Sequence, residues 1–214
     1  MQETDILKCH RREASLKNDE EMKELHDARI DLYLEWVGFA GVAHMEFIRM
    51  DWALITALVE RWRPETHTFH MTYGEVSLTL QDVALQFGLP IDGRPVTGQT
   101  GYDLGNMCAT LLGARLEGPD IKSQRVWMSW LASLIRQRLP EDADEQSVQC
   151  RTRIYILLLI GGVLFPDTSG SHVHLMFLLL LEDFRVIHTY SWGLACLAWL
   201  LDIYAELRSW EYLR

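Results

Sequence analysis

Apolar residues recur at helical spacing in the stretch that follows Asp51, and this stretch has clear ends. Asp51 can accept hydrogen bonds from the first free amides of a helix, and Trp52, Ile55 and Trp62 fall along one apolar stripe. Pro64 provides the stop, because the residue before a proline is pushed out of helical dihedral angles. The pattern predicts an amphipathic helix that begins after Asp51 and stops before Pro64.

The apolar period then changes from helical to alternating. Phe69 and Met71 lie on one face of an extended stretch, and Val76 and Leu78 continue the alternation after a turn at Thr72-Tyr73-Gly74. This arrangement predicts a small antiparallel hairpin over residues 67–79. Because two strands alone are barely stable, we expect the hairpin to pack against helices.

A second helix start follows the hairpin directly. Thr79 matches an N-cap with Asp82 three residues later, which is close to a capping box. Leu78 and Val83 occupy the positions of a hydrophobic staple on either side of this cap. Gly88 ends the helix, since glycine readily adopts the left-handed conformation of a C-cap.

The remaining apolar stretches predict further helices and contain no alternation of strands and helices typical of a parallel sheet. They lie at residues 125–139, 154–165, 172–182 and 191–207, and the acidic residues within 141–145 favour the N-terminus of the helix that runs into 154–165. We therefore predict a mainly α fold, a single globular helical domain with one small antiparallel β-hairpin. Residues 1–27 are polar and mixed in charge, so we expect a separate N-terminal segment there and the domain over residues 28–214.

Charge and composition narrow the classes of partner. The chain has 214 residues and a formal net charge of −10, whereas non-specific binding of nucleic acid needs a basic face. Arg61 and Arg63 form a local basic patch. The longest apolar runs are shorter than the roughly 20 residues that cross a bilayer, so we expect no membrane partner. The four cysteines lack a C-x-x-C spacing, which favours reduced thiols in the cytosol or nucleus.

Two histidine pairs invite a metal hypothesis, and their spacing argues against it. His67 and His70 would face opposite sides of a strand, and His172 and His174 precede a stretch that we interpret as helix, where residues two apart diverge. The sequence also lacks the common nucleophile, phosphate-binding and zinc-protease motifs. We therefore predict no catalytic residues, no metal site and no cofactor.

The amino-acid sequences of several segments resemble those of a known plant family. The segments are LITALVERWRPETHTFH (54–70), GEVSLTLQDVALQFGLPIDGRPVTG (74–98), LPEDADEQSVQ (139–149), LLLIGGVLFPDTSGSHVHLMFLLLLEDF (157–184) and YSWGLACLAWL (190–200). They resemble the plant mobile domain, the module of the MAINTENANCE OF MERISTEMS-like (MAIN-like) proteins and of plant transposons that carry it. The similarity spans roughly residues 36–200.

This resemblance implies a nuclear protein without enzymatic activity. Its expected role is in meristem maintenance and in the silencing of transposable elements and genes, through protein contacts and an indirect association with chromatin. The resemblance also implies a phosphatase-like partner of the protein phosphatase 7 family. The similar sequence segments imply an interaction surface made by Arg61, Trp62, Arg63, Glu65, His67 and His70.

Members of this family are also labelled aminotransferase-like, so pyridoxal phosphate chemistry has to be considered. That chemistry requires a lysine for the Schiff base and a phosphate cradle. Lys122 is the one lysine in the predicted globular region, and no glycine-rich strand-to-helix turn accompanies it. The residues therefore argue against an aminotransferase.

The C-terminal helix suggests a second interaction surface. Apolar residues occupy more than one of its faces, and the sequence beyond it diverges from the family, whose members usually continue further. We therefore interpret the domain as C-terminally shortened, as in a truncated or transposon-derived copy, and expect self-association or an obligate partner at an exposed apolar face. That face would include Trp199, Ile203, Leu207 and Trp210.

Two alternatives stay open at this point. Arg61-Trp62-Arg63 interleaves basic and aromatic side chains beside a predicted hairpin and helix, an arrangement that can resemble a winged DNA reader. A transposon-derived nucleic-acid-binding domain is therefore the second hypothesis. An enzyme of unrecognised type is the third.

Overall fold

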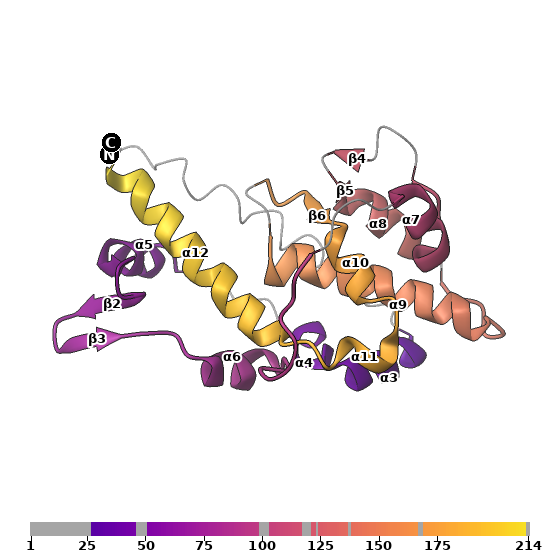
Figure 1. Cartoon of the computed structure of the whole chain (residues 1–214), viewed down its shortest axis with the longest axis horizontal. Coiled ribbons are helices and arrows are strands. Elements are labelled where there is room, and N and C mark those ends of the chain that lie inside the picture. The colour runs from indigo at the N-terminus through magenta and orange to yellow at the C-terminus, as the bar shows by residue number, and fades with distance from the viewer. Residues whose placement is uncertain are drawn as a thin grey trace.

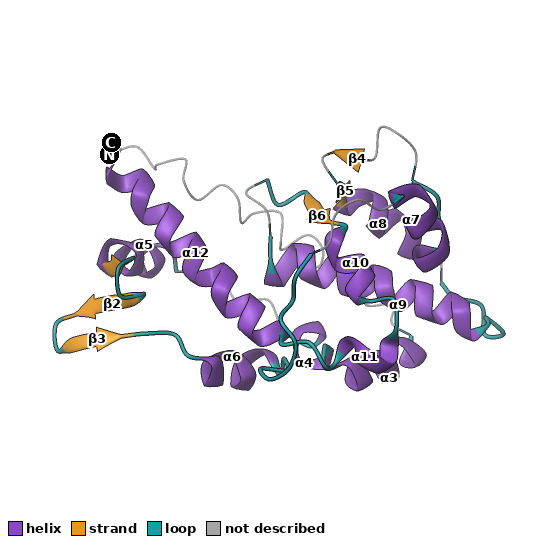
Figure 2. Cartoon of the chain, viewed as in Figure 1, coloured by secondary structure: helices purple, strands orange, loops and turns teal. Residues whose placement is uncertain are grey.

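The structure is a computed structural model, and it confirms a mainly α fold (Figures 1 and 2). Its centre is α9 (Glu145–Leu159), which continues into the π-helical turn η3 (Ile160–Leu164). Asp144 caps α9, with its Oδ1 accepting a hydrogen bond from the Ser147 amide at 2.9 Å. The described residues are 27–45, 51–98, 103–116, 121–122, 124–136, 138–166 and 169–212.

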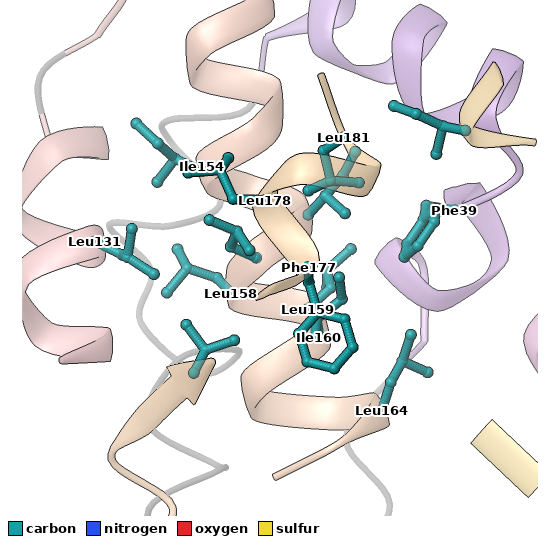
Figure 3. Packing of buried hydrophobic residues seen from close by; sticks show 14 of the residues in the cluster. Phe39, Leu131, Ile154, Leu158, Leu159, Ile160, Leu164, Phe177, Leu178 and Leu181 are labelled. Atoms are coloured by element: carbon teal, nitrogen blue, oxygen red, sulfur yellow. The ribbon is translucent and has the colours of Figure 1, made fainter. Parts of the chain in front are cut away.

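Helices surround α9 on several sides and bury its apolar residues. The contacts come from α3 (Ala28–Val37), α7 (Leu104–Leu112), α8 (Met128–Ile135) and α10 (Met176–Leu180). Figure 3 shows Leu131 of α8, Leu158 of α9 and Leu178 of α10 among the side chains of this core. Burial of such side chains is the main stabilising contribution to the fold.

The core helix begins at Glu145, within the acidic stretch that favours its N-terminus, and runs through the apolar residues 154–164. Glu145–Leu164 has 20 residues and contains an 18-residue window with a mean hydropathy of 1.3, which by length and composition is enough to span a membrane. However, 67% of this window is buried inside the structure. Its position among the surrounding helices is that of a core helix.

The first predicted helix is confirmed, but Trp62 does not belong to it. In α5 (Trp52–Arg61), Oδ1 of Asp51 accepts a hydrogen bond from the Leu54 amide at 3.1 Å. Trp62 instead begins strand β1 (Trp62–Arg63), where its backbone is extended. The helical spacing that included Trp62 was misleading, because strand pairing at the helix end overrides a weak local preference.

The predicted hairpin is confirmed within a larger sheet. Strands β2 (Thr68–Met71) and β3 (Gly74–Val76) pair antiparallel around a two-residue turn, with Phe69 opposite Val76. Strand β1 adds on the other side of β2, with Trp62 opposite Phe69. The third strand therefore comes from the two residues that follow α5.

The second predicted helix forms as expected and is followed by a loop segment. In α6 (Leu80–Phe87), the Asp82 amide donates to Thr79 Oγ1 at 3.2 Å and the Thr79 amide donates to Asp82 Oδ2 at 2.8 Å. Gly88 ends α6 in the left-handed conformation. The chain then runs from α6 towards α10 (Figure 1).

A second small antiparallel sheet, which the sequence did not predict, accompanies the sheet that contains the hairpin. Strands β4 (Ile121–Lys122), β5 (Arg125–Trp127) and β6 (His172–His174) pair antiparallel in that order. The helix predicted over 172–182 therefore begins only at Met176, and the one predicted over 125–139 begins at Met128. Strands of two or three residues are too short to show a period, and β6 pairs with a strand more than forty positions away.

The C-terminal helix α12 (Trp192–Tyr212) joins the core to the first sheet (Figure 1). Its first turns pack on α6, and its later part contacts α5 and β1. There Tyr204 lies 5.2 Å from Trp62 and 5.1 Å from Phe69, measured between ring centroids. These aromatic contacts hold the first sheet against α12. The predicted segment 1–27 lies outside the described residues except for Asp27, which caps α3.

Candidate interaction surface and cleft

The structure brings the residues singled out between positions 61 and 70 together at one end of the molecule. Trp62 is fully buried, and its neighbours are exposed around it. Trp62 therefore supports this surface from below, while the groups available to a partner belong to its neighbours. The exposed residues of this surface, which we call the hairpin surface, are Arg61, Arg63, Glu65, His67 and His70.

Local hydrogen bonds order the hairpin surface. Arg61 Nη1 donates to the Ala57 carbonyl at 2.9 Å, which places its charge at the C-terminus of α5, where the helix dipole favours a cation. His67 has a φ of 52°, and its carbonyl accepts a hydrogen bond from Ser77 Oγ at 2.8 Å. Thr68 Oγ1 donates to Glu75 Oε2 at 3.1 Å across the sheet. The backbone and several side chains are thus positioned before any partner binds.

The charge of the hairpin surface is mixed. Exposed Arg61 and Arg63 alternate with exposed Glu60 and Glu65, and Glu75 stands opposite His70 in the strand register. A binding face for the phosphate backbone would present like-signed basic groups. Exposed apolar groups lie on the same sheet, since Val76 is 54% exposed. This combination is typical of a surface for protein contacts.

The histidine side chains of these pairs are not arranged as ligands of a metal ion. His172 lies with its ring centroid 3.9 Å from that of Trp127, and its Nδ1 lies 3.0 Å from Ser171 Oγ. His174 Nδ1 accepts a hydrogen bond from the Met176 amide at 3.1 Å. Burial, together with the nearby charge of Arg125, lowers the pKa of His174. Within the described ranges, no group of three or more His, Cys, Asp or Glu side chains is placed to hold a metal ion.

The premise used against the second histidine pair was wrong, because 172–174 form strand β6 and not a helix. Residues two apart on a strand share a face, but each imidazole is engaged by a different neighbour in the structure. Lys122 lies on β4, and its side chain falls outside the described residues.

The apolar residues predicted on the C-terminal helix are only partly accessible. Trp199, Ile203 and Leu207 are partly buried, and the side chain of Trp210 lies outside the described residues. Residues 52–76, through α5 and the first sheet, contact this part of α12. The structure thus reduces the exposed area without removing it.

Self-association through α12 remains a prediction that light scattering can check. If the face of Trp199 and Ile203 binds a second copy, the mass measured at micromolar concentration will exceed that of one chain, and Ile203→Glu will restore the monomer mass. Asp202→Asn, on the exposed neighbouring position, is the matched control. A monomeric mass for the unaltered chain at these concentrations would contradict the prediction.

A cleft that the sequence did not predict lies between the segment after α6 and α10. It has a volume of about 450 Å³, within the range typical of ligand pockets. Its walls come from positions nearly one hundred residues apart, which is why no local pattern reveals it. The residues that matter for its chemistry are Arg94, Thr97, Met176, Leu180, Glu182 and Tyr190.

The thiols within the described part of the chain are buried and unpaired. Cys108, Cys150 and Cys196 form no disulfide. Burial raises the pKa of Cys108 to about 12 and that of Cys196 to about 11, so both stay protonated at neutral pH. They therefore have the character of small core residues and not of nucleophiles.

Comparisons with known proteins agree with the resemblance noted in the sequence. A serine/threonine-protein phosphatase 7 long form homolog of Arabidopsis thaliana is 48% identical over 170 residues, which cover 79% of this chain and 12% of that protein. Protein MAIN-LIKE 2 of the same plant is 41% identical over 199 residues, covering 93% of this chain and 29% of the relative. Protein MAINTENANCE OF MERISTEMS, also from Arabidopsis thaliana, is 36% identical over 201 residues, which cover 93% of this chain and 41% of that protein.

The chain thus spans between 12% and 41% of the length of these relatives. No solved structure matches it. The family model described as plant mobile domain matches residues 38–210, which include the hairpin surface, the core helix and most of α12. The chain therefore belongs to the plant mobile domain family.

Proposed function

We propose that this chain is a non-enzymatic protein-interaction module that acts in the nucleus, in meristem maintenance and in the silencing of transposable elements and genes. The observation that carries the proposal is the similarity to Protein MAINTENANCE OF MERISTEMS over 93% of the chain. The mixed charge and exposed apolar groups of the hairpin surface support protein contacts as its mode of action. Association with chromatin would then be indirect, through the bound proteins.

The partner that we propose is a phosphatase-like protein of the protein phosphatase 7 family. One relative is itself named a phosphatase 7 long form homolog, and a segment amounting to 12% of that protein is similar to this chain. A protein with a phosphatase name therefore contains a segment similar to this chain. This similarity supports the proposal that the module and a phosphatase-like protein of this family act together.

A nucleic-acid-binding domain is the second candidate, because Arg61 and Arg63 are exposed next to a hairpin. Three acidic residues stand among them, namely Glu60, Glu65 and Glu75. Since carboxylates repel the phosphate backbone, they weaken this candidate relative to protein contact.

The test is affinity purification of the tagged chain from plant nuclei, followed by mass spectrometry. Arg61→Glu with Arg63→Glu is expected to lower recovery of the phosphatase-like protein about tenfold, because reversed charges face the partner's complementary groups. Arg115→Glu with Arg136→Glu makes the same change of charge near α7 and α8, away from the first sheet (Figure 1), and is expected to leave recovery unchanged.

The same purification separates the two candidates when it is repeated after nuclease treatment. Recovery of proteins that survives the nuclease supports the interaction module. Recovery that is lost with the nucleic acid, together with DNA binding by the purified chain tighter than the roughly 10⁻⁴ to 10⁻⁶ M of non-specific contacts, would instead establish the nucleic-acid-binding domain.

A further inference from the structure

The cleft beside Arg94 has one wall with a pre-positioned cation. The guanidinium of Arg94 lies over the Tyr190 ring, with Cζ 4.4 Å from the ring centroid. Its Nη2 donates to Thr189 Oγ1 at 3.0 Å. These two contacts hold the group in one orientation, and no other described residue accepts a hydrogen bond from its remaining N–H groups. A cation held in this way loses little entropy when it binds an anion.

The backbone around Arg94 is held as firmly as its side chain. The Arg94 amide donates to the Thr189 carbonyl and the Ser191 amide donates to the Arg94 carbonyl, each at 2.8 Å, in a parallel bridge between Arg94 and Tyr190. Gly93 permits this close approach. Its φ is 113°, and a Cβ there would lie 2.2 Å from the Thr189 carbonyl oxygen.

The opposite wall is apolar and ends in a single negative charge. Met176, Leu179 and Leu180 of α10 are partly buried and line the cleft, and exposed Glu182 lies at its rim just beyond the helix. Apolar contact on one side and an oriented guanidinium on the other are the two features by which a pocket fixes the orientation of a ligand.

The loop segment that follows Arg94 forms one edge of the cleft. Pro95, Val96 and Thr97 follow the bridge at Arg94, and the backbone amides of Val96 and Thr97 donate no hydrogen bond to another described residue. Amides that lack a partner among the described residues, next to the backbone bridge at Arg94, favour the pairing of a further extended chain with this segment. A peptide therefore fits this edge better than a compact small molecule does.

Resting on the proposed function as an interaction module, we propose that this cleft binds an extended peptide of a partner protein. The peptide places an aspartate or glutamate on Arg94 and an aliphatic side chain against Met176 and Leu180. A carboxylate matches the planar guanidinium in charge and in hydrogen-bonding geometry. A phosphorylated residue fits less well, because its nearly double charge meets one arginine and the repulsion of Glu182.

An array of eight-residue peptides tests this proposal on the full chain. Each peptide carries one Leu and one Asp, separated by zero to four residues in a Gly and Ser background, and matched peptides replace Asp by Asn, Lys or phosphoserine. We expect one or two of the Leu and Asp spacings to bind best, with a loss of about tenfold on changing Asp to Asn, as for a lost charged hydrogen bond.

Variants of the chain connect the binding to the cleft. Arg94→Gln is expected to abolish the preference for Asp over Asn, and Arg94→Lys to keep part of it, since the charge remains without the planar fork. Arg185→Gln is the matched control, because Arg185 is an exposed arginine whose ion-pair partner is Asp183. Glu182→Gln is expected to increase the affinity for the phosphoserine peptides more than the affinity for the Asp peptides. Circular dichroism checks that each variant is folded.

Each outcome bears on the cleft separately from the nuclear role, because the array contains no nuclear protein. No preference for Asp, or a preference that survives in folded Arg94→Gln, would overturn the proposal. A preference for phosphoserine over Asp would assign the cleft to phosphorylated partners and overturn the acidic-peptide proposal. A failed purification from nuclei with an intact array result would reject the proposed function and leave the cleft assignment in place.

Discussion

Replacing Arg153 by alanine is expected to lower the free energy of unfolding by about 3–5 kcal/mol. Arg153 lies on α9 in the core and is 5% exposed. Its Nε donates to the Leu181 carbonyl and its Nη2 to the Glu182 carbonyl, both at 2.8 Å, and Nη1 lies 3.4 Å from the Leu111 carbonyl. One side chain thus satisfies carbonyls at the C-terminal ends of α7 and α10, which have no partner within their own helices.

The large effect follows from what alanine leaves behind. It removes charge-assisted hydrogen bonds, leaves carbonyl groups without partners and opens a cavity next to Phe184, whose ring centroid lies 4.8 Å from the Arg153 Cζ. Burial lowers the pKa of Arg153, and a guanidinium keeps its charge in proteins at neutral pH. Urea unfolding followed by circular dichroism gives the change in stability.

Two further variants make this measurement specific. Arg153→Met fills most of the volume without the hydrogen bonds and is expected to fall between the wild type and alanine. Arg185→Ala removes an exposed arginine paired with Asp183 and is expected to leave the midpoint of unfolding unchanged within error. Equal stability of Arg153→Ala and the wild type would show that water replaces the guanidinium at all three carbonyls.

Replacing Trp192 by alanine is expected to cost a similar amount, about 3–5 kcal/mol. Trp192 is fully buried at the start of α12, with its ring centroid 5.2 Å from that of Phe39. Its Nε1 donates to the Ile187 carbonyl at 3.0 Å. The residue therefore combines a large buried area with a satisfied polar group, and urea unfolding measures the loss of both.

The substitution by phenylalanine separates these two contributions, and Trp62 provides the matched control. Trp62 is also fully buried, but its Nε1 has no hydrogen-bond partner among the residues that the structure describes. Trp62→Phe removes an unsatisfied donor, whereas Trp192→Phe removes a hydrogen bond, so Trp192→Phe is expected to cost about 1–2 kcal/mol more. Equal costs would indicate that the Trp62 donor is satisfied in solution.

Local patterns in the sequence determined the elements that depend on near neighbours. Asp51, Thr79 and Gly88 mark helix ends because a cap is formed by groups three or four residues away. The two-residue turn between β2 and β3 follows from the same short range. The long segments of similar sequence identified the family, because a match of many residues in a fixed order is more specific than a match to a short motif.

The tertiary structure decided the features that need partners far along the chain. Strand β6 exists because β5, more than forty positions away, pairs with it, and Trp62 leaves its helix for a strand opposite Phe69. Arg153 acquires its role from carbonyls of two other helices. The cleft at Arg94 forms only when Tyr190 and α10 meet the segment that follows α6. The physical reason is that hydrogen bonding and burial between distant segments outweigh local preferences of a fraction of a kcal/mol per residue.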